Sequence, residues 1–242
     1  MSSIKNLFKN TFIYGLATVL PRLLTVLLTY LLTSYLPDPV AFGEVSIIFS
    51  YIIFANVILT YGMETAFFRF YNDASTKAKT LGTALISLLV TTIVFGAAAY
   101  LFIDQIEVAT ELSAQYWKWV IAVIVFDTLM VIPFAYMRVQ GRSTSYALIK
   151  LFNVVISVGT TFLFFTALKY FPAIERLLPA DRIELFFSAF LSASFITFLI
   201  VIGPYFSKWE FDKKLWKTML SYGWPILLAG FAFAINETVD KI

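Results

Sequence analysis

The sequence lacks two residue types that carry much of protein chemistry: its 242 residues include no cysteine and no histidine. Their absence excludes disulfide scaffolds, thiol catalysis, Cys/His zinc sites and histidine acid–base catalysis. Charged residues are also scarce, at 14% against about a quarter in soluble domains. Hydrophobic residues are abundant instead, at 60%, and the mean hydropathy is +0.83. A soluble globular fold and intrinsic disorder are therefore both excluded.

Catalytic motifs are missing as well. The chain has no G-x-S-x-G, P-loop or H-E-x-x-H sequence. Its clustered carboxylates, Asp104, Glu107 and Glu111, are spaced at i, i+3, i+7, which indicates the solvated face of a short helix. We therefore predict no enzyme activity, no catalytic residues, no cofactor and no metal site.

Seven apolar stretches run along the chain, each of about 20 residues, enough to cross about 30 Å of hydrocarbon. They predict an all-α fold, a polytopic bundle of membrane helices. The stretches cover residues 11–35, 45–68, 80–103, 117–137, 146–168, 185–206 and 215 onward.

Basic residues concentrate in alternate loops, and cytoplasmic loops are the ones that carry excess Lys and Arg. Eleven lie on one predicted side: Lys5, Lys9, Arg69, Lys77, Lys79, Arg138, Arg142, Lys208, Lys213, Lys214 and Lys217. Five lie on the other: Lys118, Lys169, Arg176, Arg182 and Lys241. This pattern predicts a cytoplasmic N-terminus, and it explains the net charge of +3 without nucleic-acid binding.

A short pattern occurs twice, 208 residues apart: Leu7-Phe8-Lys9 with Tyr14-Gly15, and Leu215-Trp216-Lys217 with Tyr222-Gly223. Chance similarity between two membrane-entry segments is the alternative to a true repeat. A repeat of six helices would make the second copy parallel to the first, as in transporters with two like-oriented halves. We therefore expect a six-helix lobe over 1–206, a cytoplasmic linker over 207–214 and the first helix of a truncated second lobe over 215–242.

Ionisable residues inside the spans are candidate site residues, because charge at membrane depth is costly. Arg22 lies about 20 Å beyond Lys9 along the first span, and Asp127 lies near the middle of the fourth. The two either form a structural ion pair or serve transport. In the second case Arg22 binds an anionic substrate, and Asp127 balances its charge or couples an ion.

Further candidates lie near the predicted cytoplasmic ends of two spans. In the fifth span, Lys150 and Asn153 either line a cavity or, for Lys150, reach the interface by snorkelling. Glu64 and Arg69 flank the end of the second span, and at i, i+5 they do not share a helix face. Arg69 is interpreted partly as a topology signal and partly as a substrate contact.

Several segments resemble one family, the Wzx-type polysaccharide flippases of the multidrug/oligosaccharidyl-lipid/polysaccharide exporter superfamily. Residues 62–70, Gly-Met-Glu-Thr-Ala-Phe-Phe-Arg-Phe, resemble the end of that family's second helix. The segment Arg138-x-x-Gly141-Arg142-x-x-x-Tyr146 is similar to its connection between helices four and five. Residues 35–43 are similar to its first outer loop, and residues 236–241 to its seventh helix.

The resemblance implies a flippase of the bacterial inner membrane that moves an undecaprenyl-pyrophosphate-linked oligosaccharide by alternating access through a cationic cavity. Its partners would be that lipid-linked oligosaccharide, membrane lipids and other polysaccharide assembly proteins. The candidate substrate-binding residues are Arg22, Arg69, Arg138, Arg142, Lys150 and Asn153, with Glu64 and Asp127 for ion coupling or charge balance.

Other functions stay open. A drug/cation antiporter or a lipid II flippase of the same superfamily is one alternative, although an antiporter cavity should favour acids over bases. A membrane-embedded polysaccharide polymerase or acyltransferase is another, but such enzymes usually carry a large outer loop or a catalytic His/Asp cluster. A half-chain without activity is the last.

Overall fold

The computed structural model describes residues 15, 19, 26, 29–30, 32–36, 39–170, 179–203 and 210–238, apart from the side chains of 167–170 and 237. Within these residues the secondary structure is helical and contains no strand. Most of the first predicted span, residues 11–35, lies outside them, and so does Arg22.

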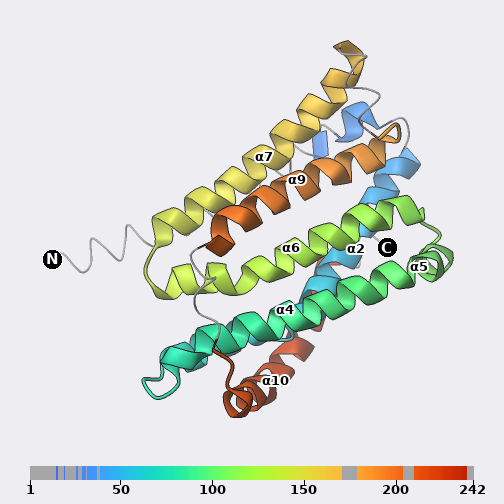
Figure 1. The fold of residues 1–242 in the computed structure, drawn as a ribbon. Coiled ribbons are helices and arrows are strands. Elements are labelled where there is room, and N and C mark those ends of the chain that lie inside the picture. Colours follow the sequence, from blue (N-terminus) through green and yellow to red (C-terminus); the bar gives the residue numbers. More distant parts are fainter. Residues whose placement is uncertain are drawn as a thin grey trace. The chain divides into compact units, whose positions relative to one another are not determined.

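From Pro39 onward the described residues form eight helices (Figure 1). They are α2 (Pro39–Thr60), α3 (Met63–Tyr71), α4 (Lys77–Leu101), α5 (Ile103–Thr110), α6 (Ala114–Val139), α7 (Ser143–Tyr170), α9 (Arg182–Ile202) and α10 (Lys213–Thr238). Six segments among the described residues are long and apolar enough to cross a membrane, and α2 with α3 counts as one of them. The predictions of an all-α polytopic bundle and of its second to seventh spans are confirmed.

The second span is broken, whereas the hydropathy pattern predicted one continuous stretch over 45–68. Between α2 and α3 the backbone enters the left-handed region at Tyr61 (φ 34°) and Gly62 (φ 71°). Glycine adopts this conformation without steric cost, so Gly62 is the residue that permits the break. A hydropathy profile does not register such a break, because the side chains on both sides of it are apolar.

The described chain falls into two compact units. Unit 1 comprises residues 1–42 and 137–197, and unit 2 comprises residues 43–136 and 198–242. In unit 1 the Tyr35 ring stacks on Phe165 of α7 at 5.3 Å, and Arg182 at the start of α9 donates a hydrogen bond to the Tyr35 carbonyl. The domain boundaries expected from the repeat remain a prediction.

In unit 2, α10 packs against α3 and α4. The closest approach joins two glycines: a Cβ on Gly62 would lie 2.3 Å from the Gly223 carbonyl oxygen, and one on Gly223 would lie 2.7 Å from that of Tyr61. Near this crossing, Ser87 of α4 bonds both Tyr61 Oη at 2.6 Å and Trp216 Nε1 at 2.7 Å. The break in the second span is therefore fastened to α4 and α10 together.

Candidate functional site

The arginines of the α6–α7 connection, Arg138 and Arg142, lie on a three-residue turn. Gly141 has φ 69°, its N–H bonds the Arg138 carbonyl at 3.1 Å, and the Arg142 N–H bonds the Met137 carbonyl at 3.0 Å. This pair of bonds is the Schellman ending of a helix, which needs a left-handed residue, usually glycine. The sequence R-x-x-G-R therefore has a structural cause: Gly141 ends α6 and places one arginine on each side of the turn.

The other unit 1 candidates, Lys150 and Asn153, share one face of α7 with Tyr146. The three residues are spaced at i, i+4, i+7, which aligns side chains along a helix. Arg138 lies over the Tyr146 ring, with its guanidinium carbon 5.6 Å from the centroid. Asn153 donates to Thr197 of α9 at 2.9 Å. The structure thus brings Arg138 close to this face, while Arg142 is exposed on the turn.

The unit 2 candidates are spread over two helices. Glu64 lies half-buried in the first turn of α3, and Arg69 is exposed in its last turn. Asp127 is half-buried at the middle of α6, as its position in the sequence predicted. Its predicted partner Arg22 lies outside the described residues, so their ion pair remains a prediction.

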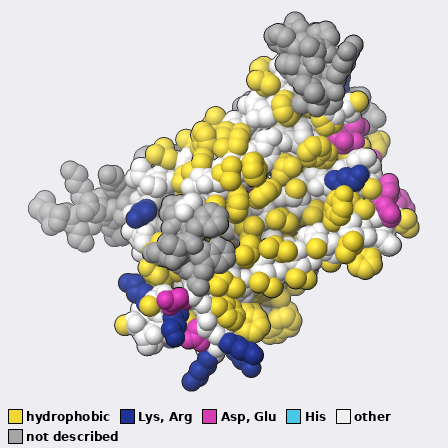
Figure 2. Space-filling view, viewed as in Figure 1, with side chains coloured by type: hydrophobic (Ala, Val, Ile, Leu, Met, Phe, Trp, Pro, Cys, Tyr) yellow, Lys and Arg dark blue, Asp and Glu magenta, His cyan; other side chains and the backbone are white. Residues whose placement is uncertain are grey.

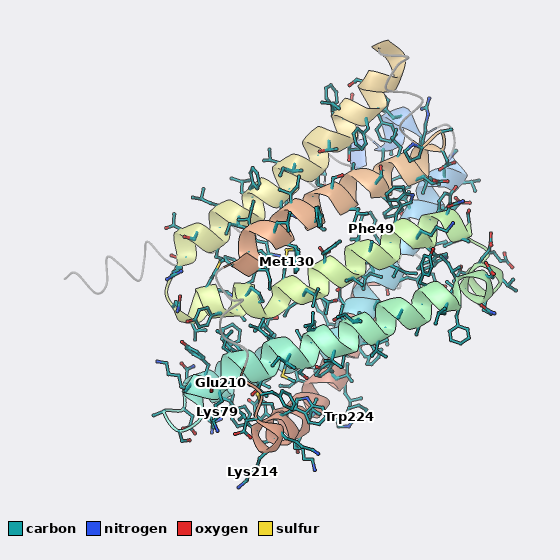
Figure 3. All side chains as sticks on the ribbon, viewed as in Figure 1. Phe49, Lys79, Met130, Glu210, Lys214 and Trp224 are labelled. Atoms are coloured by element: carbon teal, nitrogen blue, oxygen red, sulfur yellow. The ribbon has the colours of Figure 1, made fainter. Side chains whose placement is uncertain are left out.

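Lysines gather at the end of unit 2 where α4 and α10 begin, seen as dark blue in Figure 2. Asp212 accepts hydrogen bonds from the backbone N–H groups of Lys214 and Leu215, each at 3.0 Å, and so caps α10. Its other oxygen pairs with Lys79 of α4 at 3.1 Å (Figure 3). The Leu215 bond first, and then the Lys79 contact, hold the pKa of Asp212 below its usual range. This cap is therefore charged at neutral pH, and it is lost only as the pH falls through that lowered pKa.

The turn from α3 to α4 is closed by Asp73, whose carboxylate accepts hydrogen bonds from the backbone N–H and the hydroxyl of Ser75 at 2.9 and 2.7 Å. These bonds, and more weakly the charge of Arg69, lower the pKa of Asp73. Thr76 ties the turn back to α3 through a 2.6 Å bond to the Phe70 carbonyl. This anchored turn fixes where α4 starts.

A pocket of about 540 Å³ opens beside this turn. Its walls are aromatic and aliphatic, and two charged side chains lie at its rim. Tyr71 and Tyr136 meet edge to face with their ring centres 5.5 Å apart, and the Lys77 ammonium lies 5.2 Å from the centre of the Tyr71 ring. The lining residues are Tyr71, Ala74, Lys77, Ala78, Leu81, Tyr136 and Glu210.

The sequence also matches a known protein family. The profile of the family described as polysaccharide biosynthesis protein matches residues 7–242, almost the whole chain. The chain belongs to this polysaccharide biosynthesis family. No curated protein matches it. It is a multi-pass membrane protein, and the resemblance to a polysaccharide biosynthesis family drawn from its motifs is confirmed.

Among the solved structures that share the fold of this chain are two transporters. One is the outward-facing conformation of a multidrug resistance MATE family transporter of the MOP superfamily, with a TM-score of 0.73 and 16% identity over 96% of this chain. The other is a MATE transporter in complex with Br-NRF, with a TM-score of 0.68 and 16% identity over 93%. The chain spans about half of each, 53% of their length. At this identity the likeness establishes the fold alone.

The residues that form this pocket were not predicted as a group from the sequence. Lys77 contributes to the predicted topology signal, and Tyr71, Tyr136 and Glu210 belong to no predicted site. They come from the end of α3, the start of α4, the end of α6 and the segment before α10. No motif or spacing links four such separate positions, so only helix packing reveals them.

Proposed function

We propose that this protein takes part in moving an undecaprenyl-pyrophosphate-linked oligosaccharide across the bacterial inner membrane by alternating access, as a transporter and not as an enzyme. The observation that carries the proposal is the family match over residues 7–242. The fold shared with membrane transporters supports it. The substrate, its membrane and the N-terminus on the cytoplasmic side are parts of the proposal.

The basic residues give the proposal its chemistry. A pyrophosphate linked to a sugar is strongly anionic, and guanidinium groups bind phosphate through paired hydrogen bonds. Arg142 is exposed on the α6–α7 turn, and Arg69 is exposed at the end of α3. Both lie on the predicted cytoplasmic side of the membrane, the side on which such a substrate starts. Arg22, Arg138, Lys150 and Asn153 remain proposed substrate contacts, with Glu64 and Asp127 for charge balance or ion coupling.

Complementation tests the proposal. The chain is expressed in a bacterial strain that lacks its own oligosaccharide flippase, and surface polysaccharide is measured at matched protein levels. We expect polysaccharide to return, and Arg142→Ala to reduce it at least tenfold, since one charge-assisted contact contributes about 1.5–3 kcal/mol. The matched control is Lys118→Ala, an exposed lysine on the opposite predicted side.

Two results would contradict this function. No polysaccharide despite normal membrane insertion argues against transport of this substrate by this chain. Drug resistance without polysaccharide would favour the antiport alternative, which has its own support because the MATE structures that share the fold include a multidrug resistance transporter.

A further inference from the structure

The pocket in unit 2 presents one ammonium and one carboxylate that do not pair with each other. Within the described residues, Lys77 contacts the Tyr71 ring and forms no ion pair, and Glu210 forms neither a hydrogen bond nor an ion pair. Both side chains are exposed at the mouth. The pocket therefore offers hydrogen-bond donors and acceptors at one opening. Within the described chain, neither charged side chain forms an ion pair with a residue of opposite charge.

Contacts hold the Lys77 ammonium in place, and they anchor the backbone two residues beyond Glu210. The Lys77 ammonium lies over Tyr71, and the Tyr71 ring is itself stacked on the fully buried Phe67 at 5.2 Å. Glu210 is two residues before Asp212, whose N–H bonds Thr83 at 3.1 Å and whose carboxylate pairs with Lys79. Figure 3 shows Glu210 and Lys79 at the same end of α4. A ligand would therefore meet a preformed lysine and tyrosine wall, which lowers the entropic cost of binding on that side.

The walls behind the rim are apolar. Tyr136 and Leu81 are buried, and Ala74 and Ala78 have side chains small enough to leave the space open. The volume of about 540 Å³ lies within the range of about 300–1,000 Å³ seen for small-molecule sites. The ligand must therefore combine apolar faces with polar groups at its edge.

We propose that this pocket binds a short neutral saccharide, the sugar portion of the lipid-linked substrate, on the side where α4 and α10 begin. Hydroxyl groups both donate and accept, so they satisfy Glu210 and Lys77 at once. The C–H faces of sugar rings pack on the tyrosine and leucine walls. The charges of Lys77 and Glu210 cancel, so the mouth favours neither a net anion nor a net cation. That the sugar is part of a lipid-linked substrate rests on the proposed function, whereas the binding of the sugar itself is measured separately.

Binding is tested on the purified full chain in lipid nanodiscs. Neutral disaccharides of glucose, galactose, mannose and N-acetylglucosamine are titrated by saturation-transfer NMR. At least one is expected to bind. Lys77→Ala and Glu210→Gln should each weaken binding about tenfold by removing a charged hydrogen-bond partner. Ala78→Phe should abolish it by filling the pocket without changing any charge.

Matched controls separate the pocket from general surface charge. Lys214→Ala removes an exposed lysine of α10 that does not line the pocket, and Glu107→Gln removes an exposed carboxylate of α5. Both should bind as the unchanged chain does. Each variant must keep the melting temperature of the parent within a few degrees.

The proposal is overturned if none of the disaccharides binds. It is also overturned if all variants bind them as tightly as the unchanged chain. Inorganic phosphate that displaces the sugar and loses affinity in Lys77→Ala would overturn the neutral ligand in favour of an anion. Sugar binding without complementation contradicts only the proposed transport function. Complementation without sugar binding contradicts only this inference.

Discussion

At the scale of single residues, Gly141 shows how one backbone conformation fixes the geometry of a motif. Its φ of 69° ends α6, and nothing lies within 4 Å of where a Cβ would be. The requirement for glycine is therefore conformational and not steric. Because the turn places Arg138 and Arg142, strain at this position also disturbs the proposed substrate contacts.

Replacing Gly141 with alanine is expected to destabilise the protein by about 1–2 kcal/mol, the cost of a left-handed backbone for a residue with a Cβ. Thermal unfolding in nanodiscs measures the change. Gly141→Asn is the matched control and should lose less, because asparagine enters this region more readily. Equal melting temperatures for both variants and the parent would refute the conformational explanation.

At the scale of elements, the important feature is the crossing of α10 with the break between α2 and α3. Two glycines allow the backbones to touch, and the hydrogen bonds of Ser87 to Tyr61 and Trp216 hold the crossing from the α4 side. Contacts of this kind are typical of membrane helices, where small residues let backbones approach and polar side chains bond between helices. Movement of α10 would therefore act directly on α3, which carries Glu64 and Arg69.

Gly223→Ala tests this crossing. Helix propensity alone favours alanine by about 1 kcal/mol, but the new Cβ would lie 2.7 Å from the Tyr61 carbonyl oxygen. Overpacking of this kind costs about 1–3 kcal/mol, so we expect a lower melting temperature. Gly159→Ala in α7 is the control: nothing lies within 4 Å of its Cβ, so its melting temperature should stay the same or rise. A stabilised Gly223→Ala variant would show that the glycines do not touch.

At the scale of the whole molecule, the distribution of basic residues along the chain predicts the orientation in the membrane. α4 and α10 each begin with lysines, although a cation is unfavourable at the positive end of a helix dipole. Helix stability therefore does not explain these lysines, whereas the predicted orientation does, because it places both helix starts on the cytoplasmic side, where basic residues are in excess. The opposite end of α4 leads into α5, where Asp104, Glu107 and Glu111 are exposed as their spacing predicted.

Labelling of single cysteines tests the orientation, and the absence of natural cysteine leaves no background. Ala109→Cys on α5 and Thr144→Cys in the first turn of α7 both replace exposed residues. In intact spheroplasts a membrane-impermeant maleimide should modify Ala109→Cys much faster than Thr144→Cys, because only the outer face is accessible, and permeabilisation should remove the difference. The reverse order of reactivity would place the N-terminus outside.

Local patterns in the sequence predicted much of the fold, but they predicted only part of the candidate site. The spans, the position of Asp127 in mid-helix and the exposed carboxylates of α5 were all predictable, because each depends on burial in lipid or on helical spacing. The break at Tyr61–Gly62 was not, because hydropathy does not report φ. The contacts of Asn153 with Thr197, and of Glu210 with the pocket, join positions more than forty residues apart along the chain.

Hydropathy alone established a helical membrane protein, because the bilayer acts on each segment separately and needs only about 20 apolar residues to hold it. Packing between helices determined the contacts that join two segments of the chain. It brought Gly62 against Gly223, fastened Asp212 to Lys79, and gathered Tyr71, Lys77, Tyr136 and Glu210 around one pocket. Such contacts depend on how the surfaces of two helices fit together, and no single segment of the sequence contains that information.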